Sequence, residues 1–188
     1  MRLPTLSLDE LNPEQRKVAD LILSSPRKIP IDKQGLIGPF GVWARAPQVG
    51  LETQALGAKV RFSTELAENV KEVAICTVGQ FHRSKFEFAA HRKLAVAAGV
   101  DDSKLERLRC GDDPGFDGDE NIAWRVARGL LTEHLLPDAL YSEALTALGE
   151  TPLIELVLTI GYYCLVSHTL NAFEIPLTDE MEDPFPDD

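Results

Sequence analysis

A long apolar stretch near the C-terminus limits the folds open to this chain: residues 152–173 read PLIELVLTIGYYCLVSHTLNAF. A helix built from this stretch is apolar on nearly every face, so it must be covered by a protein core, a second subunit or lipid. Four polar residues interrupt it, namely Glu155, Ser167, His168 and Asn171. Because no second span and no basic flank accompany it, we expect a central or subunit-interface helix of a homo-oligomer and no membrane partner.

The rest of the chain is patterned as helices joined by loops. Asn12 and Gln15 flank Pro13 as a capping box, which predicts a helix to about residue 23. Residues 24–41 hold many Pro and Gly, which predicts an ordered loop without regular structure. Helical spacing and stop signals predict further helices over 47–62, 64–82, 84–98, 102–109, 120–133, 138–148 and 152–173. No segment alternates like a strand, so we predict an all-α fold in one domain, 1–188.

The balance of charge argues against some partners. The formal net charge is -11 and the pI about 4.8, with no run of Lys or Arg. Such a field repels nucleic acid and anionic lipid, so we expect no nucleic-acid partner. An anionic small-molecule substrate would need a local cationic or donor-rich pocket. The N-terminus has no apolar signal segment, and a cytoplasmic location is the expectation.

The cysteines and the C-terminal tail give weaker signals. Cys76, Cys110 and Cys164 form no CxxC and no metal-ligand spacing, so we expect buried, apolar thiols in a reducing compartment and no metal site. The tail, 178–188, is acidic and carries two prolines, which predicts a solvated, mobile segment.

A polar cluster is predicted where two consecutive helices face each other. Glu72 lies within an otherwise apolar stripe, and Ser84, Glu87 and His91 follow at i, i+3 and i+7 on the next helix. Long cations occupy the other faces of that helix and are expected in solvent: Lys85, Arg92 and Lys93. If the inward groups meet, burial and mutual repulsion would raise the pKa of one glutamate, as proton-transfer sites require. The spacing fits equally well a satisfied network that only braces two helices.

These residues resemble a known family. A glutamate, eleven residues and then S-x-[YF]-E-[WF]-x-x-H is the core motif of carboxymuconolactone decarboxylase-like proteins, and this chain matches it at each fixed position. The matching segments are Lys71-Glu72-Val73, Ser84-Lys85-Phe86-Glu87-Phe88-Ala89-Ala90-His91 and Ala97-Ala98-Gly99-Val100, within a core motif region of 66–100. Similarity extends upstream through Gly38-Pro39-Phe40 and downstream to Gly161-Tyr162-Tyr163 and Thr169–Glu174.

The resemblance implies an alkylhydroperoxidase (AhpD-like) helical fold that assembles as an oligomer, here a dimer, trimer or hexamer. It implies Glu72, Glu87 and His91 as catalytic residues of a cofactor-independent lyase that decarboxylates a small lactone or acid of aromatic catabolism. Peroxidases of the same superfamily carry C-x-x-C, and those two positions are Ser84 and Glu87 here. A two-cysteine peroxidase cycle is therefore not expected.

Further residues are candidates for binding the substrate. We expect Ser84, His82, Trp43 and Tyr162 to line the site. A dicarboxylate substrate would also need a cation, from Arg45, Arg61, Arg83 or a neighbouring subunit. Two other functions stay open: a noncatalytic small-molecule-binding or assembly protein, and a peroxidase that uses a lone cysteine.

Overall fold

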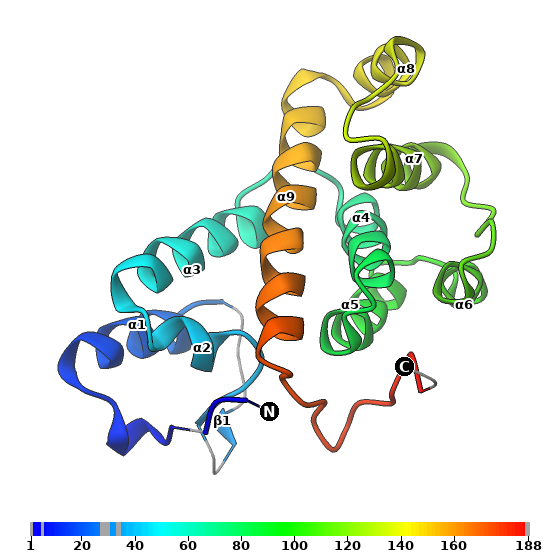
Figure 1. Ribbon diagram of the computed structural model, residues 1–188. Coiled ribbons are helices and arrows are strands. Elements are labelled where there is room, and N and C mark those ends of the chain that lie inside the picture. Colours follow the sequence, from blue (N-terminus) through cyan, green and yellow to red (C-terminus); the bar gives the residue numbers. More distant parts are fainter. Residues whose placement is uncertain (1, 5, 27–30, 33–34, 187–188) are drawn as a thin grey trace. The chain divides into compact units, whose positions relative to one another are not determined.

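The computed structural model describes the whole chain except residues 1, 5, 27–30, 33–34 and 187–188, and only the backbone of 31–32 (Figure 1). The regular secondary structure of the described residues is helical apart from one short hairpin, which confirms the all-α prediction. The elements are η1 Leu8–Glu10, α1 Pro13–Leu23, β1 Ile31–Asp32, β2 Gly35–Leu36, α2 Phe40–Ala44, α3 Pro47–Phe62, α4 Glu68–Phe81, α5 Lys85–Ala97, α6 Asp102–Cys110, α7 Gly118–Thr132, α8 Asp138–Leu148 and α9 Glu150–Ala172.

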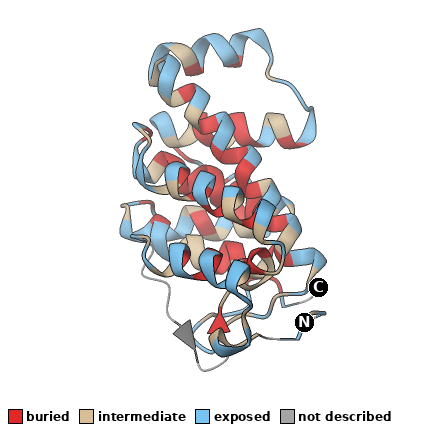
Figure 2. Ribbon diagram, turned by 90° about the vertical axis from the view of Figure 1, so that its left-hand side faces the viewer, coloured by how far each residue is buried: buried red, intermediate tan, exposed pale blue. Residues whose placement is uncertain are grey.

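The chain divides into two compact units. One comprises 1–64 with 169–176, and the other comprises 65–168 with 177–188. Compact units of this size also occur within single domains, so the predicted single domain stays a prediction. Each unit has buried apolar residues on the inner faces of its helices, coloured red in Figure 2.

In the first unit, α1 packs on α2 and α3. The capping box is present: Asn12 accepts hydrogen bonds from the backbone N–H groups of Glu14 and Gln15, and Gln15 accepts one from Asn12. A core of Val18, Ala19, Ile22, Leu36 and Ala44 holds these elements together. A Cβ at Gly50 would overlap the carbonyl of Trp43, so the crossing of α2 and α3 requires glycine at that position.

The prediction of no regular structure over 24–41 is wrong at three places, while 27–30 and 33–34 lie outside the described residues. Two-residue strands β1 and β2 pair antiparallel, and α2 begins at Phe40. Gly35 has φ 116°, which only glycine adopts readily, and this lets the strand pass close to the backbone of Leu6. Pro39 precedes α2 with φ −72°, a value already suited to a helix.

Helix α4 is the centre of the second unit. Every residue from Val70 to Gly79 is buried, and α5, α6 and α7 all pack against this helix. Even Lys71 is buried, with its ammonium 3.0 Å from Glu68. Polar groups on α4 therefore face protein on all sides, and each needs a partner from a neighbouring helix.

The turn between α4 and α5 is tight and fixes their spacing. Arg83 has φ 51°, the N–H of Ser84 donates to Gly79 at 2.8 Å, and that of Arg83 donates to Gln80 at 3.0 Å. This is a Schellman motif with arginine where glycine is usual. Farther along, a Cβ at Gly79 would lie 3.2 Å from the backbone nitrogen of Phe88, so the two helices are in close contact there.

Helix α9 has an inner and an outer face. Its Glu155 accepts the backbone N–H groups of Glu65 and Leu66 at 2.8 and 3.1 Å, just before α4 begins. Among the described residues α9 is the one helix long and apolar enough to cross a membrane, and half of its most apolar window is buried within the protein. Large apolar residues on the outer face are exposed: Ile154, Val157, Leu158 and Leu165.

The prediction that the tail is solvated is right for most of its described residues, which are exposed, and wrong at Pro184 and Phe185, which are buried. Phe185 is 1% exposed, and the segment lies on α5 and α6. The acidic composition predicted solvent, but cations of α5 bind the tail. Lys85 pairs with Asp183, and Lys93 donates to the carbonyl of Glu180. Lys93 is exposed, as expected for the long cations of α5. Lys85 and Arg92 are only partly exposed and form ion pairs, Lys85 with Asp183 and Arg92 with Asp102 and Glu106.

Candidate functional site

The predicted polar cluster forms in the second unit. Glu72 comes from the middle of α4, Ser84 immediately precedes α5, and Glu87 and His91 lie on the first turns of α5. Glu72, Ser84 and Glu87 are 0–1% exposed, so these groups do point inward. Helix α9 covers the cluster with Tyr163 and Ser167.

Glu72 and His91 form a close pair. Their Oε2 and Nδ1 atoms are 2.7 Å apart, and the side chains are 0% and 13% exposed. A carboxylate can only accept, so Nδ1 carries the hydrogen whenever Glu72 is ionised, and Nε2 is then the nitrogen free for proton exchange. The rings of Tyr163 and His91 meet edge to face, with centroids 4.9 Å and planes 82° apart, so Tyr163 packs against the imidazole.

Glu87 is the second buried acid. Burial raises the pKa of Glu87 well above its usual value; the hydrogen bond from Ser167 lowers it and the charge of Glu72 raises it further. The Ser167 hydroxyl donates to Glu87 Oε2 at 3.0 Å. Within the described part of the chain, Glu87 Oε1 and the Ser84 hydroxyl are buried without a hydrogen-bond partner. Buried polar atoms without partners are costly and are frequent at sites that receive a ligand.

The arrangement suits proton transfer. A carboxyl at Glu87 that keeps its proton can give it to a substrate, and the imidazole of His91 can exchange a proton through Nε2. Glu72 and Glu87 lie in different environments. When the environments of two such groups move their pKa values apart, one can act as an acid and the other as a base.

The predicted substrate-binding residues lie in different places. His82 caps α4 and its ring contacts His168, with centroids 4.7 Å apart; burial, then the His168 charge, lowers the pKa of His82. Tyr162 is buried, with its ring 5.4 Å from that of Tyr163. Trp43 belongs to the first unit, where its indole N–H donates to Thr169 at 3.4 Å. Their binding roles stay predictions.

Ser167 was not among the predicted site residues. Its hydroxyl donates to Glu87, eighty positions earlier in the sequence, from α9. Its signal was its position as a polar residue in an apolar helix, four residues after Tyr163.

Two of the three cysteines depart from the prediction of buried thiols. Cys76 is buried, whereas Cys110 is exposed and Cys164 is half-buried. Burial and the carboxylates of Glu72 and Glu87 raise the pKa of Cys76 well above its usual value, which makes its thiolate inaccessible. Cys110 ends α6 at the surface because the next residue, Gly111, turns the chain away with φ 82°.

The candidate cations have partners of other kinds. Arg83 stacks on the ring of Phe185 at 4.4 Å, Arg45 donates to the carbonyl of Pro4, and Arg61 lies over Phe62 at 5.9 Å. The described residues contain no group of three or more His, Cys, Asp or Glu placed to hold a metal. A shallow surface pocket between α7 and α8 contains none of the predicted site residues and is lined by 116–119, 121–122, 142–143 and 146–147.

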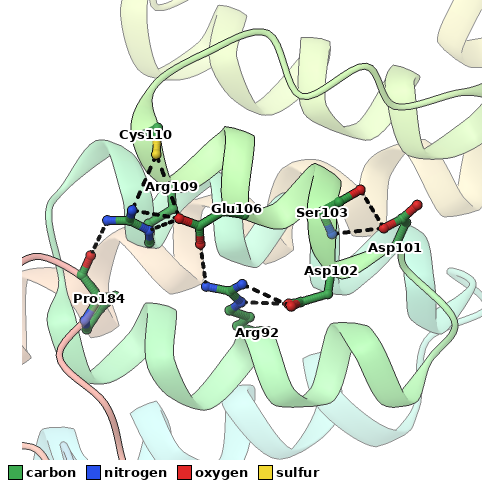
Figure 3. Close-up of polar contacts among 8 residues, drawn as sticks. All are labelled: Arg92, Asp101, Asp102, Ser103, Glu106, Arg109, Cys110 and Pro184. Carbon is green, nitrogen blue, oxygen red and sulfur yellow. Dashed lines mark hydrogen bonds and ion pairs between the residues drawn. The ribbon is translucent and has the colours of Figure 1, made fainter.

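An ion-pair network ties α5 to α6 on the surface of the same unit (Figure 3). Arg92 bonds Asp102 at 2.7 Å and Glu106 at 2.8 Å, and Arg109 bonds the other oxygen of Glu106 at 2.7 Å. The Arg109 hydrogen bond, followed by that of Arg92, lowers the pKa of Glu106 to about 2. The network involves neither Glu72 nor Glu87.

Acid should weaken this network. The folded pKa of Glu106 is below its unfolded value, so its contribution is present above about pH 4.5 and is lost as pH falls towards 2. Because the side chain is 44% exposed, solvent screens the pairs and the contribution is about 1 kcal/mol or less. In urea unfolding at pH 7, Glu106→Gln should have a free energy of unfolding lower than that of the parent by this contribution. Between pH 4.5 and 2, its free energy of unfolding should fall less steeply than that of the parent. Glu182→Gln, at an exposed residue of the tail, is the control. If the free energy of unfolding falls equally below pH 4.5 in Glu106→Gln and in the parent, the assignment is wrong.

The chain matches no protein-family model, and a search of curated proteins finds no match.

Proposed function

We propose that this protein is a carboxymuconolactone decarboxylase-like lyase that acts on a small lactone or carboxylic acid without a cofactor. The observation that supports it is the Glu72–His91 pair, 2.7 Å apart, on the same two helices as the buried acid Glu87. The sequence resemblance assigns the same three residues to catalysis.

The chemistry follows from these groups. When the carboxylate of the substrate leaves as CO2, the electron pair of the broken C–C bond delocalises through the lactone onto its carbonyl oxygen. A donor at that oxygen stabilises the enolate, and the positively charged form of His91, paired with Glu72, suits this role. Glu87 then gives its proton to carbon, and solvent restores the proton.

A second candidate is a noncatalytic protein in which the cluster braces α4, α5 and α9. Full burial of Glu72, Ser84 and Glu87 favours it, because a substrate must reach groups that solvent scarcely touches. His91, 13% exposed, is the most accessible member of the cluster. Exposed apolar residues on α9 support the further expectation of a homo-oligomer, whose neighbouring subunit is also a source for the missing cation.

The proposal is tested by an ultraviolet assay of purified protein with γ-carboxymuconolactone, beside a thiol-dependent hydroperoxide assay. We expect lactone turnover and no peroxide turnover, with Cys110→Ser unchanged in both assays. Peroxide turnover that disappears in Cys110→Ser would overturn the proposal in favour of a lone-cysteine peroxidase. If lactones and related acids are not turned over, and substitutions of Glu72, Glu87 or His91 greatly lower stability, the noncatalytic alternative is favoured.

A further inference from the structure

Phe88 lies at the point where α4 and α5 come closest. It follows Glu87 directly in α5 and is 0% exposed. Its backbone nitrogen would be 3.2 Å from a Cβ at Gly79, so the two helices lie close together here and a side chain at position 79 would push them apart. Any outward movement of α5 would lengthen the 2.7 Å contact between His91 and Glu72.

The C-terminal tail packs against Phe88. Phe185 is 1% exposed, and its ring centroid is 5.4 Å from that of Phe88. The guanidinium of Arg83, in the turn that joins α4 to α5, lies 4.4 Å from the centre of the Phe185 ring. One tail residue therefore contacts both the turn and the first part of the motif helix.

Cations of α5 and α6 hold the tail over the residues that precede Phe185. Lys85 pairs with Asp183 at 2.8 Å, Lys93 donates to the carbonyl of Glu180 at 2.8 Å, and Arg109 donates to that of Pro184 at 2.8 Å. Figure 3 shows the Arg109 contact, which joins the tail to the α5–α6 network. A segment without helix or strand has little reason to follow this path unless these contacts fix it.

We propose that residues 180–185 form a strap that clamps α5 against α4, and that Phe185 is a positioning residue for the His91–Glu72 pair. The docking of the strap stands on the contacts alone, whereas its effect on turnover rests on the proposed function. The surface of α5, α6 and the turn before α5 therefore fits an acidic peptide with one aromatic side chain. In this protein that peptide is the chain's own tail.

The test uses the full-length chain with Phe185→Ala and the matched control Phe185→Leu, which keeps a large apolar side chain. We expect Phe185→Ala to speed amide hydrogen exchange in 85–97 at least tenfold and to shift or broaden the side-chain nitrogen resonances of His91. Phe185→Leu should stay close to the parent in both. If Phe185→Ala changes neither exchange nor the His91 resonances, the proposal is wrong.

A second variant covers poor folding of Phe185→Ala. Asp183→Asn removes the ion pair with Lys85 and should speed exchange in 85–97 by a few-fold at low salt, with the difference from the parent lost at high salt. If exchange in 85–97 does not differ between Asp183→Asn and the parent at low salt, the ion pair with Lys85 does not help to hold the strap. A synthetic peptide of residues 178–186 at millimolar concentration should restore slow exchange to Phe185→Ala, and failure to do so would count against a specific seat.

Turnover gives a separate readout. If the lyase proposal holds, Phe185→Ala should lower kcat about tenfold or more with KM nearly unchanged, because misaligned proton donors affect the reaction more than binding. If no lactone is turned over by the parent, the proposed function fails, while the exchange and resonance measurements still decide whether the strap exists.

Discussion

Substitution of His91 by asparagine is expected to reduce lactone turnover by about 10²- to 10⁴-fold, the usual contribution of one acid–base group. The amide nitrogen of asparagine takes the place of Nδ1 and can still donate to Glu72, which lies 2.7 Å away. The substitution therefore removes the titratable ring while it keeps the partner of the buried carboxylate.

The stability of the variants separates catalysis from bracing. His91→Asn should unfold in urea within about 1 kcal/mol of the parent, since the hydrogen bond is kept. His91→Ala should lose turnover equally and be less stable by about 1–3 kcal/mol, because Glu72, which is 0% exposed, loses this partner. Full turnover in His91→Asn would show that the imidazole is not part of the reaction.

Glu87→Gln should have opposite effects on activity and stability. Glutamine keeps an oxygen that can accept the hydrogen bond from Ser167, but it has no proton to give. We expect turnover to fall by about 10²-fold or more. We also expect the variant to be more stable than the parent at alkaline pH by about 1–3 kcal/mol, because no charge has to form in the buried site.

The pH dependence of that gain follows from the raised pKa of Glu87. A folded pKa above the unfolded value gives a contribution that is complete below about pH 4.5 and is lost as pH rises towards the folded pKa. The stability of Glu87→Gln relative to the parent should therefore grow with pH above 4.5, as urea unfolding at pH 5, 7 and 9 would measure. Glu143→Gln, on the surface of α8, is the control. A constant or shrinking difference between Glu87→Gln and the parent would contradict the assignment.

Local signals in the sequence predicted most of the helices. The bounds of α3 and α8 agree with the expected 47–62 and 138–148, and the capping box at Asn12 starts α1 as expected. α4 begins at Glu68 rather than at 64: Ala67 has ψ 140°, outside the helical range, and Glu155, far along the chain, accepts the backbone N–H groups of Glu65 and Leu66 in the segment before it. A boundary set by a distant residue leaves no local pattern.

The candidate site shows the same division. The i, i+3, i+7 spacing correctly predicted that Ser84, Glu87 and His91 face inward, and Glu72 contacts His91. Ser167 could not be paired with Glu87 in advance, because spacing on one helix does not reveal which distant helix faces it. The buried end of the tail was misjudged for a related reason: composition does not reveal that cations of α5 and α6 bind Asp183 and the carbonyls of Glu180 and Pro184.

Infrared difference spectroscopy can show, without knowledge of the substrate, whether Glu87 is a buried, uncharged acid on the same two helices as the Glu72–His91 pair. Spectra of the parent and Glu87→Gln are compared at pH 6.5, where an ordinary glutamate, with a pKa of about 4.3, is ionised. We predict a C=O stretching band of a protonated carboxyl in the parent that is absent from Glu87→Gln. Only carboxylate bands in the parent at this pH would contradict the account.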